Sequence, residues 1–151
     1  MIAFEPAREA DLPQLVELLA LLFDQEAEFK PDAAKQAAAL KQILADPARG
    51  RIYVARDGRQ VVAMASLLFT ISTAEGGKAA WLEDLVVRPE YRQQGTGEKM
   101  LGYVVSQARA EGVLRITLLI DMQYERAQAL YRRAGFVGSP MRPMRLKLKK
   151  G

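Results

Sequence analysis

Residues Val87–Lys99 read VRPEYRQQGTGEK and determine how this part of the chain folds. An apolar run ends at Val87, and a helical pattern of apolar residues begins at Met100. The stretch is therefore predicted to be the end of a strand, a basic glycine-containing turn and the start of a helix. The first N–H groups of a helix have no partner within the helix, and the helix dipole adds positive partial charge there. This order predicts a backbone site for a phosphorylated ligand.

Two glycines let the turn approach an anion closely. Gly95 and Gly97 put no side chain between the backbone and a ligand, and glycine adopts positive φ at little cost. Arg92 and Lys99 bracket the turn with positive charge. The stretch lacks the spacing of a P-loop, and Met100 stands where a Rossmann fingerprint needs its third glycine. An ordinary strand-to-helix loop is the alternative that this motif alone leaves open.

The composition is typical of one globular domain, and we expect residues 1–151 to form it. Hydrophobic residues make up 50% of the chain and charged residues 26%. No apolar run approaches the roughly 20 residues that span a bilayer. The N-terminus also lacks a signal pattern, because acidic residues come too early. We therefore expect a cytoplasmic protein with no membrane partner.

The chain contains no cysteine and no histidine, which limits its chemistry. Disulfides, cysteine nucleophiles, the usual zinc sites and Ser-His-Asp mechanisms are excluded, and we expect no metal. Any proton transfer must use Glu, Asp, Tyr, Lys or water. The net charge of +4 suits a polyanionic cofactor or nucleic acid. No nucleic-acid-binding motif is present, so nucleic acid is not an expected partner.

Hydrophobic periodicity and turn residues predict the element order β-α-α-β-β-β-α-β-α-β-β. Asp11 is the predicted N-cap of the first helix, with Gln14 completing the spacing of a capping box. The fold class is α/β (α+β), with a mixed, largely antiparallel sheet flanked by helices. Helices are expected at 11–24, 32–44, 97–111 and 124–134, and strands at 1–5, 51–56, 61–72, 79–88, 113–120, 136–137 and 141–148.

Two motifs and this order resemble the GNAT superfamily of N-acetyltransferases, which use acetyl-coenzyme A. Residues Arg92–Gly97 (RQQGTG), placed after a Val-x-Pro, match the superfamily's glycine turn. Residues Arg126–Phe136 (RAQALYRRAGF) resemble its Arg-Ala-x-x-x-Tyr-x-x-x-Gly-Phe segment. Leu82–Leu85 (LEDL) is similar to the matching segment of diamine acetyltransferases.

The resemblance implies acetyl-CoA as cosubstrate and places its binding residues. The turn amides would bind the pyrophosphate, and the backbone of Leu85 and Val87 would bind the pantetheine arm. Tyr124 stands where the superfamily often has an asparagine. The expected coenzyme-binding residues are Leu85, Val86, Val87, Arg92, Gln93, Gln94, Gly95, Thr96, Gly97, Glu98, Tyr124 and Ala127.

Tyr131 is the implied general acid, which protonates the leaving thiolate as an amine attacks the acetyl group. A phenol with a pKa near 10 is protonated at neutral pH and suits that role. A core aromatic residue is the alternative. Leu119 occupies the position of a glutamate that some members carry, so Glu83 or water is the expected base. For Glu83 and Asp84, two adjacent acids in an apolar run, a structural ion pair stays open.

The acceptor is expected to be a primary amine of a small molecule or peptide. Acidic and aromatic residues suit a cationic substrate, and the expected substrate-binding residues are Asp84, Glu26 and Phe29. Solvated charge at a helix end is the alternative for these acids. Transfer of another acyl group and a non-catalytic acyl-CoA-binding module remain open as functions. We expect a homodimer.

Overall fold

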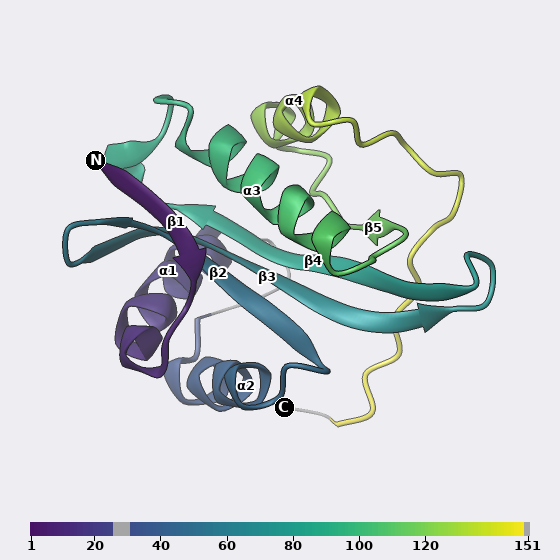
Figure 1. Cartoon of the computed structure of the whole chain (residues 1–151), viewed down its shortest axis with the longest axis horizontal. Helices are drawn as coiled ribbons and strands as arrows, with labels where there is room; N and C mark the ends of the chain where they lie inside the picture. Colours follow the sequence, from purple (N-terminus) through teal and green to yellow (C-terminus); the bar gives the residue numbers. More distant parts are fainter. Residues whose placement is uncertain (26–30, 150–151) are drawn as a thin grey trace.

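A five-stranded sheet lies at the centre of the computed structural model, which describes residues 1–25 and 31–149 (Figure 1). Its strands follow one another in space in chain order, and only the β4–β5 pair is parallel. The mixed, largely antiparallel sheet predicted from the sequence is therefore confirmed. The strands are β1 (Ile2–Pro6), β2 (Gly50–Asp57), β3 (Gln60–Ser72), β4 (Gly77–Val87) and β5 (Ile116–Thr117).

Four helices in the described residues cover the two faces of this sheet (Figure 1). They are α1 (Leu12–Gln25), α2 (Ala33–Ala45), α3 (Thr96–Ala110) and α4 (Glu125–Arg133). One buried cluster joins β2, β3 and β4 to α3, and side chains of α4 pack against it. A second cluster on the opposite face joins the same strands to α1 and α2. Strands β2, β3 and β4 contribute apolar side chains to both layers, as a sheet covered on both faces requires.

Local turn chemistry explains why the strands and helices end where they do. Asp57 pairs with Gln60 in the β2–β3 hairpin, whose turn contains Gly58 at φ 59°. The Asp32 carboxylate accepts the Lys35 N–H at 3.2 Å and caps α2. Gly112, at φ 79°, follows α3. The predicted hairpin and these helix limits are confirmed to within one or two residues.

The predicted cap of the first helix is wrong. Asp11 ends a 3-10 turn before α1, and its carboxylate accepts the Arg8 main-chain N–H at 2.8 Å. The same carboxylate also forms a two-pronged ion pair with Arg56, with both N···O distances at 2.9 Å. Gln14 instead accepts the Val61 N–H at 2.7 Å. A partner distant in sequence thus outcompetes the local capping interaction.

The last part of the predicted sheet also differs. The expected strand at 113–120 is a strand only at Ile116–Thr117, although the Leu114 N–H donates to the Lys78 carbonyl and the Ala80 N–H donates to the Arg115 carbonyl, both at 2.9 Å. Leu119, within the expected strand, is 56% exposed. The expected strands at 136–137 and 141–148 do not form, and the segment passes the sheet without joining it (Figure 1). Pro143 explains part of this difference, because proline has no N–H to donate to a ladder. The apolar side chains of Met144, Leu146 and Leu148 are consequently exposed.

A β-bulge in β4 explains why β5 pairs so briefly. Ser66 faces Asp84 and Leu67 faces Leu82, so Glu83 is an extra residue on β4. Such a bulge bends the strand and increases its twist, which commonly ends pairing on the other side. The β4–β5 pairing stops at Trp81 and Thr117, just before the bulge. Within the described residues, no helix has the length and apolar character needed to cross a bilayer.

Candidate active site

The turn between β4 and α3 has the backbone geometry of an anion cradle. After a 3-10 turn at Pro89–Tyr91, Gln93 adopts φ 62° and Gly95 adopts φ 81°. A left-handed backbone costs a residue with a side chain about 1–2 kcal/mol, and such strain is found mainly at ligand-binding sites. Residues with a left-handed backbone in a turn can direct successive N–H groups toward one concavity. Gly95 is the N-cap of α3, with no side-chain cap, so the first N–H groups of the helix remain available to a ligand.

Side-chain hydrogen bonds hold this turn from three directions. The Tyr91 hydroxyl donates to the Asp57 carboxylate at 2.7 Å and so joins the turn to the β2–β3 hairpin. Arg92 Nε donates to the Val87 carbonyl at 2.8 Å, and Gln94 Nε2 donates to the Glu90 carbonyl at 2.9 Å. Arg92 and Gln94 therefore shape the loop through their side chains. The turn is thus held in its strained form by the protein itself.

The outer edge of β4 is open beside this turn. The Arg88 N–H donates to the Val62 carbonyl of β3, so alternation along the strand turns the peptide groups of Leu85 and Val87 away from β3. β5 does not extend to this part of β4. Val86, also expected at the coenzyme site, has its side chain buried in the α1–α2 layer, and the same alternation turns its peptide group toward β3. An extended amide-containing ligand could pair with this edge as a strand would.

Gly97 leaves a space between β4 and α4. A Cβ atom at Gly97 would lie 3.6 Å from Val87 and 3.7 Å from Leu130, which is ordinary contact. Glycine is thus not required by packing at this position. Glu98 lies at the same helix start and faces Arg133 of α4 at 3.9 Å, an exposed ion pair. These contacts place α4 beside the turn.

Tyr131 lies on α4, with its ring partly buried against the α3 layer. Its ring packs edge-on against Phe136 at 5.8 Å between centroids. Burial, and secondly the negative charge of Asp84, raises the pKa of Tyr131 to about 12. The hydroxyl is therefore fully protonated at neutral pH. Both features agree with a proton donor, and the packing agrees equally with the core-aromatic alternative.

The two adjacent acids on β4 have different environments. Glu83, the bulged residue, is exposed, whereas Asp84 is partly buried and accepts the Ser66 hydroxyl at 2.8 Å. Ser66 is fully buried in the middle of β3. Sequence reasoning missed Ser66, although a lone hydroxyl in the apolar run Val61–Leu68 was a usable signal. Asp84 thus contacts Ser66 directly and acts on Tyr131 through its charge.

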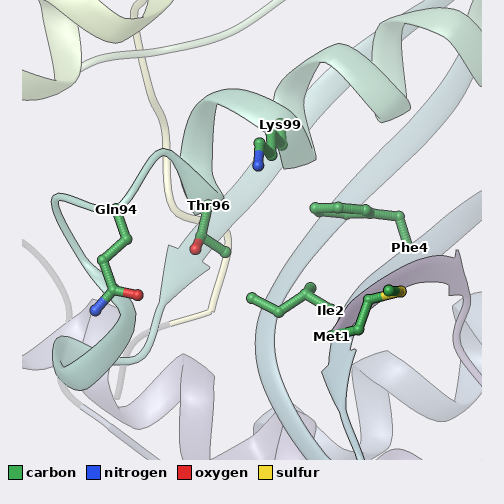
Figure 2. A pocket seen from close by; sticks show the side chains of 6 residues that line it. All are labelled: Met1, Ile2, Phe4, Gln94, Thr96 and Lys99. Carbon is green, nitrogen blue, oxygen red and sulfur yellow. The ribbon is translucent and has the colours of Figure 1, made fainter.

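The remaining predicted residues are partly brought together. Tyr124 is the N-cap of α4 and is 40% exposed, and Ala127 lies in the first turns of the same helix. Thr96 is buried at the start of α3, and its side chain points toward β1 (Figure 2). Lys99 shares a cavity lining with Gln94 and Thr96 of the turn (Figure 2). Glu26 and Phe29 lie outside the described residues.

A family model identifies the family to which the chain belongs. The model of the acetyltransferase (GNAT) family matches residues 12–136, and the chain belongs to this family. A thialysine N-epsilon-acetyltransferase from Bos taurus is 36% identical over 78 residues, covering 52% of this chain and 45% of that protein. The matched segments span less than half of the length of the curated relatives.

Solved structures resemble the whole fold. An integron cassette protein from the mobile metagenome of Cole Harbour Salt Marsh has a TM-score of 0.85 at 28% identity, covering 98% of this chain and 91% of that one. A possible acetyltransferase from Clostridium difficile 630 has a TM-score of 0.88 at 19% identity, covering 99% of both chains. The second likeness bears on the fold alone.

Proposed function

We propose that this protein transfers an acetyl group from acetyl-CoA to a primary amine. The observation that carries the proposal is the strained turn, with Gln93 and Gly95 both at positive φ, next to the open edge of β4. Family membership supports acetyl transfer. The named action of the Bos taurus relative, on an ε-amine, supports an amine acceptor.

The residues present fit the coenzyme. The main-chain amides of Gln93–Glu98 would bind the pyrophosphate, where the helix dipole favours an anion. The outward peptide groups of Leu85 and Val87 would bind the amides of the pantetheine arm. Tyr124 and Ala127 would border the same channel from α4. When bound, acetyl-CoA would supply the acetyl group as a thioester.

Tyr131 would act as the general acid. The amine nitrogen forms a bond to the acetyl carbon, the carbon–sulfur bond breaks, and the Tyr131 hydroxyl gives its proton to the departing sulfur. A pKa of about 12 keeps that proton in place until sulfur becomes basic. Glu83, exposed at the bulge, or water would take the proton that the amine must lose. Asp84 would attract the cationic form of the amine before it reacts.

The acceptor we propose is a small-molecule or peptide amine. Glu26 and Phe29 remain proposed substrate contacts together with Asp84. We keep the cytoplasmic location and the homodimer as parts of the proposal, and sedimentation of the purified chain tests the homodimer.

Thiol release from acetyl-CoA tests the proposal with a panel of thialysine, lysine, a polyamine, an aminoglycoside and a peptide N-terminus. At least one amine should give turnover. Tyr131→Phe should lower kcat by about 10²–10⁴-fold and leave coenzyme affinity, measured by calorimetry, unchanged. Tyr103→Phe is the matched control, because Tyr103 packs between Phe4 and Tyr53. If acetyl-CoA binds but no amine releases thiol, the chain is a binding module and the proposal fails.

A further inference from the structure

A cavity of about 290 Å³ lies between the start of α3 and the N-terminal end of β1 (Figure 2). One wall is apolar, and the opposite wall carries an amide, a hydroxyl and an ammonium group. The lining residues are Met1, Ile2, Phe4, Gln94, Thr96 and Lys99. This lining contains no carboxylate side chain. The volume of the cavity is at the lower end of the range for small-molecule sites.

The Thr96 hydroxyl is the group of the cavity wall that could form a hydrogen bond with a ligand. Thr96 is only 4% exposed and lines the cavity, and in Figure 2 its oxygen lies on the side of Gln94 and its methyl group on the side of Ile2. Among the described residues, every fully buried side-chain nitrogen or oxygen has a hydrogen-bond partner. The Thr96 hydroxyl has none in that part of the chain, so the small exposed area of Thr96 is where it meets the cavity. A ligand oxygen there would give this hydroxyl a partner.

Lys99 supplies a positive charge at the polar wall of the cavity. Its ammonium group points into the same space, one helical turn after Thr96, and forms no ion pair within the described residues (Figure 2). Glu98, the residue before Lys99, faces Arg133, and Asp57 accepts from Tyr91 and pairs with the N-terminal ammonium of Met1 at 3.8 Å. The positive end of α3 adds to the potential of Lys99. The polar wall therefore favours an anion.

The apolar wall of the cavity would contact an apolar part of the bound anion. Ile2 and Phe4 face the polar wall across the cavity (Figure 2). We propose that the cavity binds a small carboxylate with an aromatic or branched aliphatic body, its carboxylate on Thr96 and Lys99 and its body against Ile2 and Phe4. The volume accommodates a ligand the size of phenylacetate and excludes a coenzyme-sized molecule.

This site is distinct from the proposed coenzyme site. Gly97 faces Val87 and Leu130, whereas Thr96 and Lys99 face β1. The two sites therefore lie on different sides of the first turn of α3. The carboxylate site does not depend on the proposed acetyl transfer, since it uses the side chains of the turn and the coenzyme would use its main chain.

Phenylacetate titrated into the full chain tests the site, with binding followed by NMR chemical shifts. Saturable binding is expected at a Kd on the order of 1 mM or lower, with shifts centred on Thr96, Lys99 and Ile2. Lys99→Met should weaken binding at least about fivefold, and Thr96→Val by a smaller factor. Lys41→Met, which removes an exposed charge on α2, is the matched control and should leave the affinity unchanged.

Further ligands define the outcomes that overturn the site. 2-Phenylethanol keeps the body without the charge, and acetate keeps the charge without the body, so both should bind several-fold more weakly. Equal affinity for 2-phenylethanol, or indifference to Lys99→Met, would show only an apolar surface. With saturating coenzyme A, phenylacetate should still bind, at reduced affinity because two anions are close. Complete displacement would assign the cavity to the coenzyme. A chain that never binds coenzyme would refute the proposed function and leave this site standing.

Discussion

Arg92 Nε donates a hydrogen bond to the main-chain carbonyl oxygen of Val87 at 2.8 Å. The bond closes the turn over the end of β4 and joins the two parts of the proposed coenzyme site. The residue after Arg92, Gln93, carries the left-handed strain of the turn. Arg92 therefore acts on the coenzyme by holding the loop, in addition to its charge.

Arg92→Met should lower acetyl-CoA affinity by roughly ten- to a hundredfold, because a hydrogen bond from a charged donor contributes about 1.5–3 kcal/mol. Calorimetry measures the change. Arg109→Met, at the exposed far end of α3, removes the same charge and should leave the affinity within about twofold. An equal loss in both variants would indicate net charge and not the hydrogen bond to Val87.

Gly95→Ala and Gly102→Ala should change stability in opposite directions. Neither added Cβ meets an atom within 4 Å, so packing is equal, but Gly95 has φ 81° and Gly102 lies within α3. Gly95→Ala should lower the free energy of unfolding by about 1–2 kcal/mol. Gly102→Ala should raise it by about 0.5–1 kcal/mol. Urea denaturation measures both, and a neutral Gly95→Ala would mean that the turn is not left-handed in solution.

Gly97→Glu should abolish acetyl-CoA binding while the chain stays folded. The Cβ fits between Val87 and Leu130, so the carboxylate would project into the phosphate space and repel the ligand. Calorimetry with acetyl-CoA and a circular dichroism melt separate the two effects. Gly97→Ala is the matched variant and should bind with intermediate affinity. Unchanged affinity of Gly97→Glu would show that the pyrophosphate lies elsewhere.

The sequence predicts best those features that depend on neighbouring residues. The turn at Gly95, the hairpin at Gly58 and the end of α3 at Gly112 each follow from local backbone preference. Features set by distant partners were harder to predict. Asp11 looked like a helix cap because the sequence does not reveal that Arg56 takes its carboxylate. Ser66 was missed because its pairing with Asp84 depends on the register beside the bulge.

The predicted C-terminal strands, which do not form, show the same limit of prediction from local sequence. Alternation of apolar and basic residues from Met144 to Lys149 fits a strand, but a strand also needs an edge to pair with. β5 offers two paired residues, and Pro143 removes a donor. The sequence singles out the two acids on β4 as adjacent charges in an apolar run. Only the structure distinguishes the exposed Glu83 from Asp84 beside Ser66.

Asp84→Asn should lower the pKa of Tyr131. Burial is the main reason for its pKa of about 12, and the negative charge of Asp84 is the second. A neutral amide removes the second cause, so the phenol should ionise at lower pH, still above its ordinary value. NMR of ¹³C-labelled tyrosine, assigned with Tyr131→Phe, follows this titration. Glu75→Gln, distant from α4, should leave it unchanged. An unchanged pKa of Tyr131 in Asp84→Asn would show that the charge of Asp84 does not act on Tyr131.

Asp11→Asn should lower stability and flatten its dependence on acid pH. The carboxylate is buried against Arg56, and this contact holds the pKa of Asp11 below its ordinary value. A lowered folded-state pKa means that the stabilisation is present above the unfolded pKa, near 3.8, and is lost as pH falls through the folded value. Removing one partner of such a pair costs about 3–5 kcal/mol at neutral pH.

Urea denaturation at neutral pH and near pH 2 measures the Asp11→Asn effect, and the gap between native and variant chains should narrow in acid. Glu75→Gln breaks an exposed pair with Arg115, at 3.6 Å, and should change stability by less than about 1 kcal/mol at either pH. If Asp11→Asn were no more costly than Glu75→Gln, the Asp11–Arg56 pair would add nothing beyond an exposed one. The attachment of the start of α1 to β2, which this pair spans, would then be stabilised by the apolar packing of that layer alone.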